Sequence, residues 1–432
     1  MDYKPGNIHY SSSHTWTKLL GSWVVSSAVL MVLTACGAAE EPVFSESYAE
    51  LAPTPALHVL VVGEITTFAG TGSPKFGGDG GPAKAAGMYA PSGISIDSDG
   101  NLFVAADKRV RKVDVATGIV TTVAGSGRSL GLGDGGPALE ASFRETRGIA
   151  VDSAGNIFIA DNGSGRIRRV DVATGVITTA AGGGAGDPRA KIFGDGGQAT
   201  EALVKQPDDV EVDAGGDLYI ATDNRIRKVD SASGVINTVA GTGERGVEGD
   251  GGPATSASFA EPVGIVVDGQ GNMFIADKEN HRIRRIDGSS GVMTTLAGMG
   301  KHYERTAMSY RGNVGNSYDY TGEAATGAGY SGDGGPAVDA MLSLPSGIAL
   351  APDGSLYFAD GNVRVRKVNP STGIITTVAA DEYQSMQESG KVAVHTDVIG
   401  EIVSIVINSR GELFLADFKK NLVHRVTASS TQ

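Results

Sequence analysis

The sequence of 432 residues predicts an all-β fold, a six-bladed β-propeller, and three observations support this prediction. A pattern of Gly-Asp-Gly-Gly followed by four short strands occurs five times, which indicates repeated supersecondary units. The strands are apolar at successive positions, so both faces of each sheet must be covered, as they are when four-stranded sheets stack radially. A partial sixth copy and a spare N-terminal strand complete the ring. The aspartates of the five motifs are Asp79, Asp134, Asp195, Asp250 and Asp333.

The second copy shows the elements of one blade in order. Residues 148–152, 156–161, 166–171 and 175–180 each predict a strand. The turn after the first strand has the pattern Asp-x-x-Gly-Asn, and the turn after the third has the pattern Asp-x-x-Thr-Gly. Because these are hairpin connections, each blade should be an antiparallel meander.

The ring is expected to close through the N-terminal strand. The sixth copy, at residues 402–426, is not followed by a Thr-rich fourth strand. Residues 64–70 have the pattern of such a strand and match residues 373–379. We therefore expect the N-terminal strand to complete the C-terminal blade, which leaves only short, protected edges.

A targeting segment precedes the predicted propeller. An apolar run at residues 19–33 leads into Leu33-Thr34-Ala35-Cys36, which resembles the lipobox of bacterial lipoproteins. An uncleaved signal anchor is the alternative, although the run is short for a membrane span. We expect a lipoprotein signal peptide at 1–35, a flexible tether at 36–60, the propeller at 61–427 and a C-terminal tail at 428–432. Lipidation at Cys36 would place the exported protein on the cell membrane or the outer membrane.

The charge of the chain argues against nucleic acid as a partner. The formal net charge is −13, and it becomes −14 once residues 1–35, with two lysines and one aspartate, are removed. A negative surface repels nucleic acid and anionic lipid headgroups. Cys36 is the only cysteine, so no disulfide within the mature chain is expected. We expect a monomer.

One stretch carries a family resemblance. Residues 278–287, Lys-Glu-Asn-His-Arg-Ile-Arg-Arg-Ile-Asp, resemble the NHL repeat, and the Gly-Asp-Gly-Gly-Pro-Ala motif is similar to the form in bacterial secreted NHL proteins and in the teneurin propeller. The resemblance covers roughly residues 61 to 427 and implies a propeller of NHL type. NHL propellers include protein-binding and RNA-binding modules, sensors and a few metal-dependent enzymes. Fold alone cannot choose among these functions.

The repeated polar residues have structural explanations. We expect each Gly-Asp-Gly-Gly aspartate to accept hydrogen bonds from the short turn that follows it, although a ring of carboxylates that binds cations or a basic partner is the alternative. The Asp-x-x-Gly-Asn turns lack the length of an EF-hand and are expected to be Asx-type turns. The Arg-x-Arg stretches, such as residues 109–112 and 225–228, are expected to form cross-strand ion pairs with Asp at the ends of neighbouring strands rather than a phosphate site.

Evidence for an enzyme is limited to one strand. Asp208, Asp209 and Glu211 interrupt an otherwise apolar inner strand and are candidate ligands for a divalent cation of the lactonase type, or a polar lining of the central channel. The histidines do not recur around the ring as a zinc-dependent lyase would need. We therefore expect no cofactor and favour a non-enzymatic protein, with a metal-dependent lyase or lactonase as the alternative.

The insert at residues 301–331 is the main departure from the repeat. Tyrosine-rich loops suit adaptable recognition, because the ring gives contact area and the hydroxyl gives polar contacts. The insert is interpreted either as a binding loop or as a disordered spacer. Binding would make the protein a scaffold in the bacterial cell envelope for a protein or glycan ligand. The candidate ligand-binding residues are Tyr303, Tyr310, Tyr318, Tyr320, Tyr330, His302 and Arg305.

Overall fold

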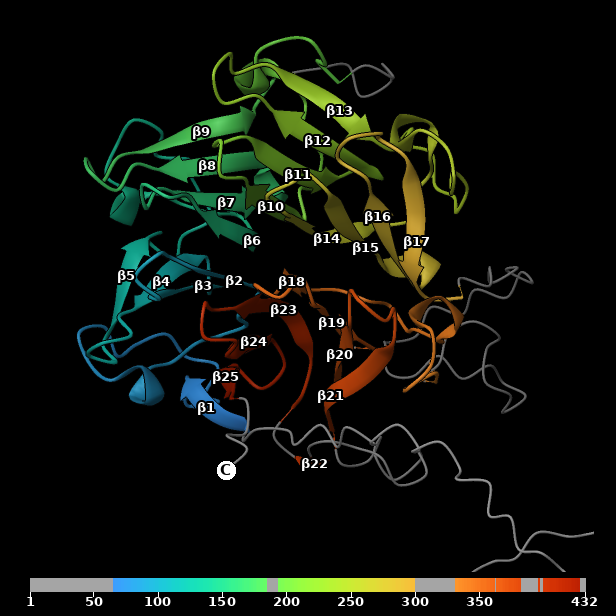
Figure 1. The fold of residues 1–432 in the computed structure, drawn as a ribbon. Coiled ribbons are helices and arrows are strands. Elements are labelled where there is room, and N and C mark those ends of the chain that lie inside the picture. Colours follow the sequence, from blue (N-terminus) through green and yellow to red (C-terminus); the bar gives the residue numbers. More distant parts are fainter. Residues whose placement is uncertain are drawn as a thin grey trace, which may run out of the picture. The chain divides into compact units, whose positions relative to one another are not determined.

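The computed structural model describes residues 65–184, 193–299, 331–361, 363–381, 395–396 and 399–427. The chain separates into two units, Met1–His58 and Val59–Gln432, and every described residue belongs to the second. This unit is built from β-strands with short 3-10 helices (Figure 1). In the part of the chain that the structure describes, no helix has the length and apolar character needed to cross a bilayer.

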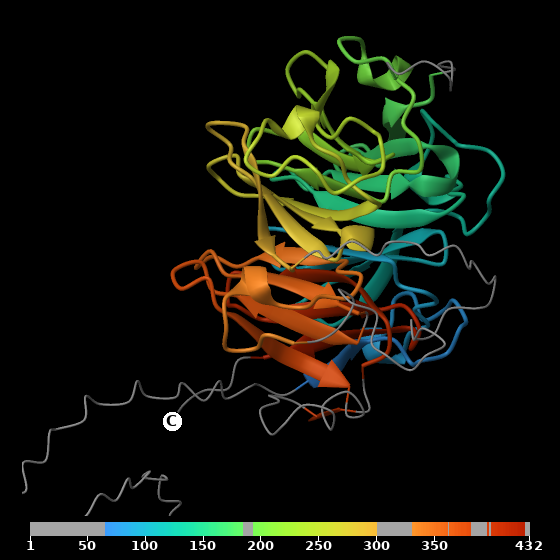
Figure 2. The ribbon, with the colours of Figure 1, turned by 90° about the vertical axis from the view of Figure 1, so that its right-hand side faces the viewer.

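Five blades each contain four consecutive strands paired antiparallel, seen from two directions in Figures 1 and 2. Blade 1 contains β2 (Gly93–Ile96), β3 (Leu102–Ala106), β4 (Arg109–Val113) and β5 (Val120–Ala124). Blade 2 contains β6 (Thr146–Val151), β7 (Ile157–Asp161), β8 (Arg166–Val170) and β9 (Ile177–Gly182). Blade 3 contains β10 (Asp209–Val212), β11 (Leu218–Thr222), β12 (Arg225–Val229) and β13 (Ile236–Ala240). Blade 4 contains β14 (Pro262–Val267), β15 (Met273–Asp277), β16 (Arg282–Ile286) and β17 (Met293–Ala297). Blade 5 contains β18 (Ile348–Leu350), β19 (Leu356–Asp360), β20 (Arg364–Val368) and β21 (Ile375–Asp381).

The sixth blade joins the two ends of the ring, as the sequence predicts. It contains β23 (Ile402–Ile407), β24 (Leu413–Asp417) and β25 (Leu422–Val426), and its fourth strand is β1 (Ile65–Ala69). β1 pairs antiparallel with β25, with Ile65 opposite Val426. The sequence did not predict β22 (His395–Thr396), a short strand that pairs parallel with β21 in blade 5.

The core consists of six apolar clusters, one between each pair of neighbouring blades. Leu102 of blade 1 packs in one cluster with Phe414 of blade 6, and Phe158 of blade 2 packs in another with Ile220 of blade 3. Each sheet is therefore covered on both faces, as the apolar strands require. The clusters hold the inner strands at fixed positions around the axis.

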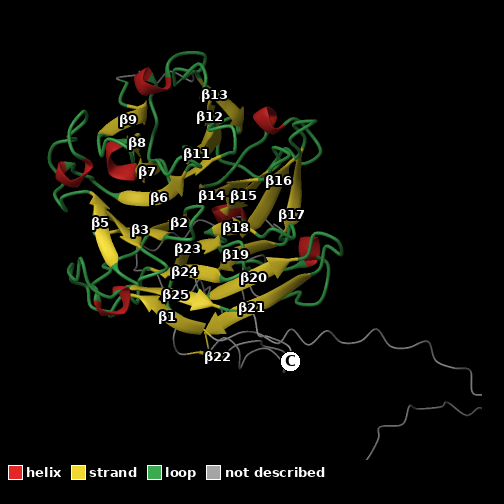
Figure 3. Ribbon diagram, turned by 60° about the vertical axis from the view of Figure 1, so that its left-hand side comes forward, coloured by secondary structure: helices red, strands yellow, loops and turns green. Residues whose placement is uncertain are grey.

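Seven short 3-10 helices connect the described strands, several of them on the outside of the ring (Figure 3). Five lie in the links between blades: η1 (Ala83–Ala85), η2 (Ala138–Glu140), η4 (Ala199–Glu201), η5 (Ala254–Ser256) and η7 (Ala337–Asp339). Two follow second strands: η3 (Asn162–Ser164) and η6 (Lys278–Asn280).

The predicted role of the Gly-Asp-Gly-Gly aspartates as caps is wrong. Pro82 occupies the cap position of η1, and no side chain caps this helix. The carboxylate of Asp79 instead accepts hydrogen bonds from Arg111 at 2.7 Å and from Thr122 at 2.7 Å. Gly78 and Gly80 flank it at φ +85° and +78°, a backbone region that favours glycine. This turn directs the carboxylate toward the third and fourth strands of the blade that follows it.

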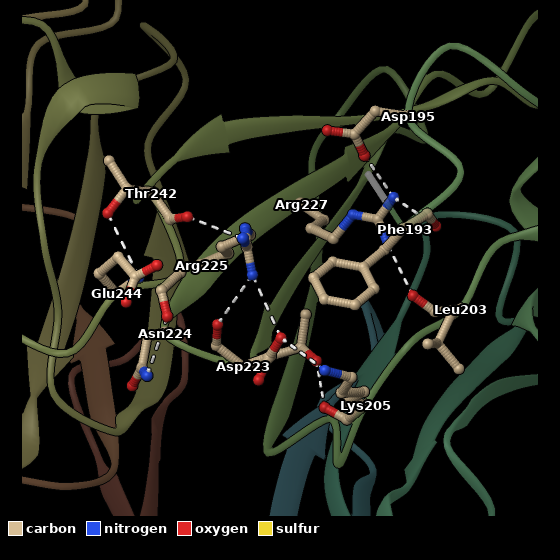
Figure 4. Close-up of polar contacts among 12 residues, drawn as sticks. Phe193, Asp195, Leu203, Lys205, Asp223, Asn224, Arg225, Arg227, Thr242 and Glu244 are labelled. Atoms are coloured by element: carbon tan, nitrogen blue, oxygen red, sulfur yellow. Dashed lines mark hydrogen bonds and ion pairs between the residues drawn. The ribbon is translucent and has the colours of Figure 1, made fainter. Parts of the chain in front are cut away.

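The same contact recurs in the other blades with the motif. The pairs are Asp134 with Arg168, Asp195 with Arg227, Asp250 with Arg284, and Asp333 with Arg366. Figure 4 shows the pair in blade 3, where Arg227 also donates to the backbone carbonyl of Leu203 at 2.9 Å. We call each of these pairs a latch. The arginine stretches do form ion pairs, but the predicted cross-strand partner is wrong for the latch arginine, whose partner comes from the preceding link.

The hairpin turns after the first strands are Asx-type turns, as predicted. The Oδ1 atom of Asp97 accepts hydrogen bonds from the backbone N–H of Asp99 at 3.1 Å and of Asn101 at 2.8 Å. Asp152 makes the equivalent bonds in blade 2. These carboxylates accept hydrogen bonds from the N–H groups of their own turns, so the repeated pattern of the turn is explained without a calcium ion.

Candidate functional site: the central channel

The six inner strands line a central cavity of about 710 Å³. This volume lies within the usual range of small-molecule sites. Glycine occupies one equivalent position near the start of the inner strand in four of the blades, and it allows neighbouring inner strands to approach closely. A side chain at Gly93 would collide with the carbonyl of Arg147, and one at Gly347 with the backbone of Ser404. Only blades 3 and 6 carry side chains at this position, Asp209 and Ser404.

We define the mouth of the channel as its end on the face that carries the links between blades. Two exposed aromatic side chains lie there, Tyr89 at 45% exposure before blade 1 and Phe418 at 42% in blade 6. Acidic and basic side chains occur there in equal number: Asp107, Glu145, Asp208 and Glu401, with Lys108, Arg144, Arg147 and Lys278. The mouth therefore combines apolar contact area with balanced polar groups.

Asp208 lies at the mouth and is neutralised there. Its carboxylate pairs with Arg147 of β6, which also contacts Glu145 at 3.0 Å. Burial raises the pKa of the Asp208 carboxyl, and the charge of Arg147 opposes that shift. The ion pair therefore ties Asp208 of blade 3 to blade 2.

Asp209 joins two blades. One carboxylate oxygen accepts from the backbone N–H of Val210 at 3.0 Å, and the other accepts from the N–H of Ile265 in β14 at 3.0 Å. Burial raises the pKa of Asp209 to about 7, although both hydrogen bonds favour its charged form. Its contacts are those of a structural bridge between β10 and β14. Ser404 accepts from the N–H of Ile94 in the same way, between blades 6 and 1, at 3.2 Å.

Glu211 differs from both aspartates because its carboxyl has no hydrogen bond or ion pair with any residue that the structure describes. The alternation of side chains along β10 puts it on the same side as Asp209, two residues farther from the mouth. Burial raises its pKa to about 8, and the negative charges of Asp209 and Asp213 act in the same direction. The carboxyl is enclosed by protein, with part of its surface open to the cavity.

The three candidate metal ligands therefore share one wall of the channel without forming a metal site. Asp208 forms an ion pair with Arg147, and Asp209 accepts a hydrogen bond from the backbone of β14. Glu211 has no partner among the described residues. Among the described residues, no three His, Cys, Asp or Glu side chains come together in a way that could hold a metal ion.

The other candidate residues lie outside the described part of the chain. These are Cys36, His302, Tyr303, Arg305, Tyr310, Tyr318, Tyr320 and Tyr330. The described ends of the insert do lie close together. The N–H of Met299 donates to the carbonyl of Ala340 at 2.9 Å, and Ser331 pairs with the adjacent Met341. The insert thus leaves and rejoins the propeller at neighbouring points.

The mouth residues Tyr89, Arg144, Glu401 and Phe418 were not among the residues predicted from the sequence. A signal for them exists in the repeat. Tyr89, Arg144 and Glu401 lie just before a first strand, and Phe418 lies just after a second strand. In a propeller these two positions meet on one face, so variable polar or aromatic residues there mark the mouth.

The sequence matches the model of one known protein family. The model of the teneurin NHL domain matches residues 60–132, 128–187, 242–315 and 323–402, which together exceed half of the chain. The chain belongs to this NHL family. The resemblance found in residues 278–287 and in the Gly-Asp-Gly-Gly motifs is confirmed.

This NHL propeller has relatives among much longer proteins. Mouse teneurin-1 is 30% identical over 247 residues, which cover 55% of the chain and 8% of teneurin-1. The Arabidopsis thaliana protein SUPPRESSOR OF QUENCHING 1, chloroplastic is 26% identical over 294 residues, which cover 66% of the chain and 25% of that protein. The chain thus spans a quarter or less of the length of these relatives.

Solved structures agree on the fold of the NHL propeller. An auxiliary nutrient binding protein from Bacteroides thetaiotaomicron superposes with a TM-score of 0.52 at 15% identity, covering 84% of this chain and 76% of that one. A structural genomics protein of unknown function from the same organism gives a TM-score of 0.54 at 16% identity, covering 84% and 75%. At this identity the likeness concerns the fold alone.

Proposed function

We propose that this NHL propeller is a ligand-binding scaffold of the bacterial cell envelope, anchored by lipid at Cys36, that captures a protein or glycan at the mouth of its channel. The observation that carries the proposal is the cavity of about 710 Å³ with its mixed aromatic and charged mouth. Pockets with apolar walls and a few convergent polar groups are the usual sites of ligand binding. Export and anchoring rest on residues 19–36.

The aromatic residues of the mouth support a recognition role. Tyr89 and Phe418 belong to blades that are neighbours in the closed ring, and both expose more than two fifths of their surface. Aromatic rings supply large contact areas at low entropic cost. Arg144 and Glu401 lie at the same mouth with no side-chain partner among the described residues, so they are available to a ligand.

The Tyr-rich insert would extend this surface. It lies within the link between blades 4 and 5, and such links lead to the first strands at the mouth. The alternative function, a metal-dependent lyase or lactonase, has less support because Asp208 and Asp209 are engaged with Arg147 and β14. A stoichiometric divalent ion in elemental analysis of the purified protein would favour that alternative.

A capture experiment tests the proposal. The full chain, immobilised, is exposed to a glycan array and to envelope extracts, beside a trimmed variant in which residues 127–131 replace residues 300–330. Tyr89→Ala and Phe418→Ala test the mouth, and Phe76→Ala is a matched control because Phe76 is 41% exposed and does not line the cavity. We expect capture to fall in the trimmed and mouth variants, by about 1 to 2 kcal/mol or more at a hot-spot residue. Unchanged capture in all three variants would contradict the proposal.

A further inference from the structure

The inner part of the channel carries one ionisable side chain at the level of Glu211. The six inner strands contribute equivalent residues at this level: Ser95, Ala150, Glu211, Val266, Ala349 and Val406. All six line the cavity. Five of them are apolar or hydroxylic, so the carboxyl faces a largely apolar ring.

Glu211 has no internal counter-charge among the described residues. The charges that act on its carboxyl are those of Asp209 on the same strand and Asp213 just beyond it, and both are negative. Across the hairpin lies Tyr219, whose hydroxyl donates to Asp213 at 3.2 Å. Arg147, a cation at the mouth, is already paired with Asp208 and Glu145, and Lys228, two strands away, is paired with Asp217. A buried carboxyl without a partner lacks the stabilisation that such groups usually receive.

The structure thus presents a cavity of ligand size with apolar walls, one unpaired carboxyl inside and balanced charges at its entrance. We propose that this channel binds a small primary amine with an apolar body, whose ammonium group pairs with Glu211. The apolar body would lie against Val266, Ala349 and Val406. The proposal rests on the proposed function, in that it names the class of ligand, or of group on a larger ligand, that the channel takes.

Two further features agree with this assignment. The raised pKa of Glu211, about 8, reflects burial with no cation beside the carboxyl. A bound ammonium would supply that charge and form a charge-assisted hydrogen bond. The whole chain has a net charge of −13, which attracts cations from solution.

Binding of matched probes to the full chain tests the assignment. Benzylamine supplies an ammonium group on an apolar ring, benzyl alcohol is its neutral counterpart, and benzoate is an anion of similar size. Titration calorimetry at neutral pH should give benzylamine at least tenfold tighter binding than either other probe. Glu211→Gln should remove this preference because the neutral amide keeps the shape and loses the charge. Glu140→Gln, at an exposed residue of η2 that does not line the cavity, should keep the preference.

The outcomes separate the two proposals. Equal binding of all three probes, blocked by Ser95→Trp, would overturn the amine assignment and leave the channel as a ligand site. Amine preference that survives Glu211→Gln, or no binding of any probe, would also overturn the assignment. The capture experiment described above would still decide the proposed function. Thermal melting of each variant shows whether it is folded.

Discussion

Arg168 of β8 lies 2.6 Å from Asp134 in the link before its blade, with the arginine side chain completely buried and the aspartate 38% exposed. The Oδ2 atom of Asp134 also accepts from Thr179 of β9 at 2.7 Å. One carboxylate from a link thus holds the two outer strands of the next blade. Five blades contain such a latch.

The latch should be a main determinant of stability. Replacing Asp134 with Ala leaves the buried guanidinium of Arg168 without its carboxylate partner, which should lower the free energy of unfolding by about 1 to 3 kcal/mol. Asp99→Ala is the matched control, since Asp99 is an exposed turn residue whose loss should cost about 0.5 kcal/mol or less. Urea unfolding followed by circular dichroism measures both. Equal midpoints for the two variants would show that the latch is dispensable.

Closure of the ring depends on β1. Deleting residues 61–70 should expose the edge of β25 and cause unfolding or aggregation, because an unpaired strand edge has unsatisfied backbone groups. Deleting residues 38–57 serves as the control and should hardly change the melting temperature. The two deletions are compared by thermal melting and size-exclusion chromatography. The same melting temperature in both would refute closure by β1.

The carboxyl of Glu211 should make the protein less stable as the pH rises. Its pKa is about 8 in the folded protein against an ordinary value of 4.5, so the unfolded chain releases the proton first. Stability should therefore fall between about pH 5 and pH 8, and Asp209, with a pKa of about 7, contributes in the same direction. Glu211→Gln should reduce this slope, because the amide does not titrate. Parallel pH profiles for wild type and Glu211→Gln, in urea unfolding, would contradict the assignment.

The anchor rests on a single cysteine. Cys36→Ser should block lipid attachment and cleavage by the lipoprotein route, which metabolic palmitate labelling and detergent partitioning can follow. Label that persists in the mutant would count against the lipobox. Because Trp16 and Trp23 are the only tryptophans, the processed protein should also lack tryptophan fluorescence.

Much of the fold could be predicted because the repeat displays each element five times. The strand order, the Asx turns and the pairing of β1 with β25 all follow from local patterns that recur in register. The latch could not be predicted, because it joins residues more than 30 positions apart, such as Asp79 and Arg111. A hint was present in blade 6, where no Gly-Asp-Gly-Gly motif precedes the blade and His424 replaces the latch arginine. His424 instead pairs with Asp417 at 3.1 Å.

The candidate site was predicted only in part. Asp208, Asp209 and Glu211 stand out in the sequence because they interrupt an apolar strand, and the structure places all three in the channel wall. Their separate roles depend on neighbours from other blades, Arg147 in β6 and Ile265 in β14. A single sequence contains no record of such contacts.

Binding of the ligand inside the channel can be followed by methyl NMR of the full chain labelled at isoleucine. Ile265, Ile348 and Ile405 line the cavity, whereas Ile177 and Ile236 lie buried in the outer strands β9 and β13. On addition of the captured envelope ligand, we predict chemical-shift changes at the three channel methyls and none at the two outer ones. Unchanged chemical shifts of the channel methyls, with changes confined to the methyls of the outer strands, would contradict binding in the channel.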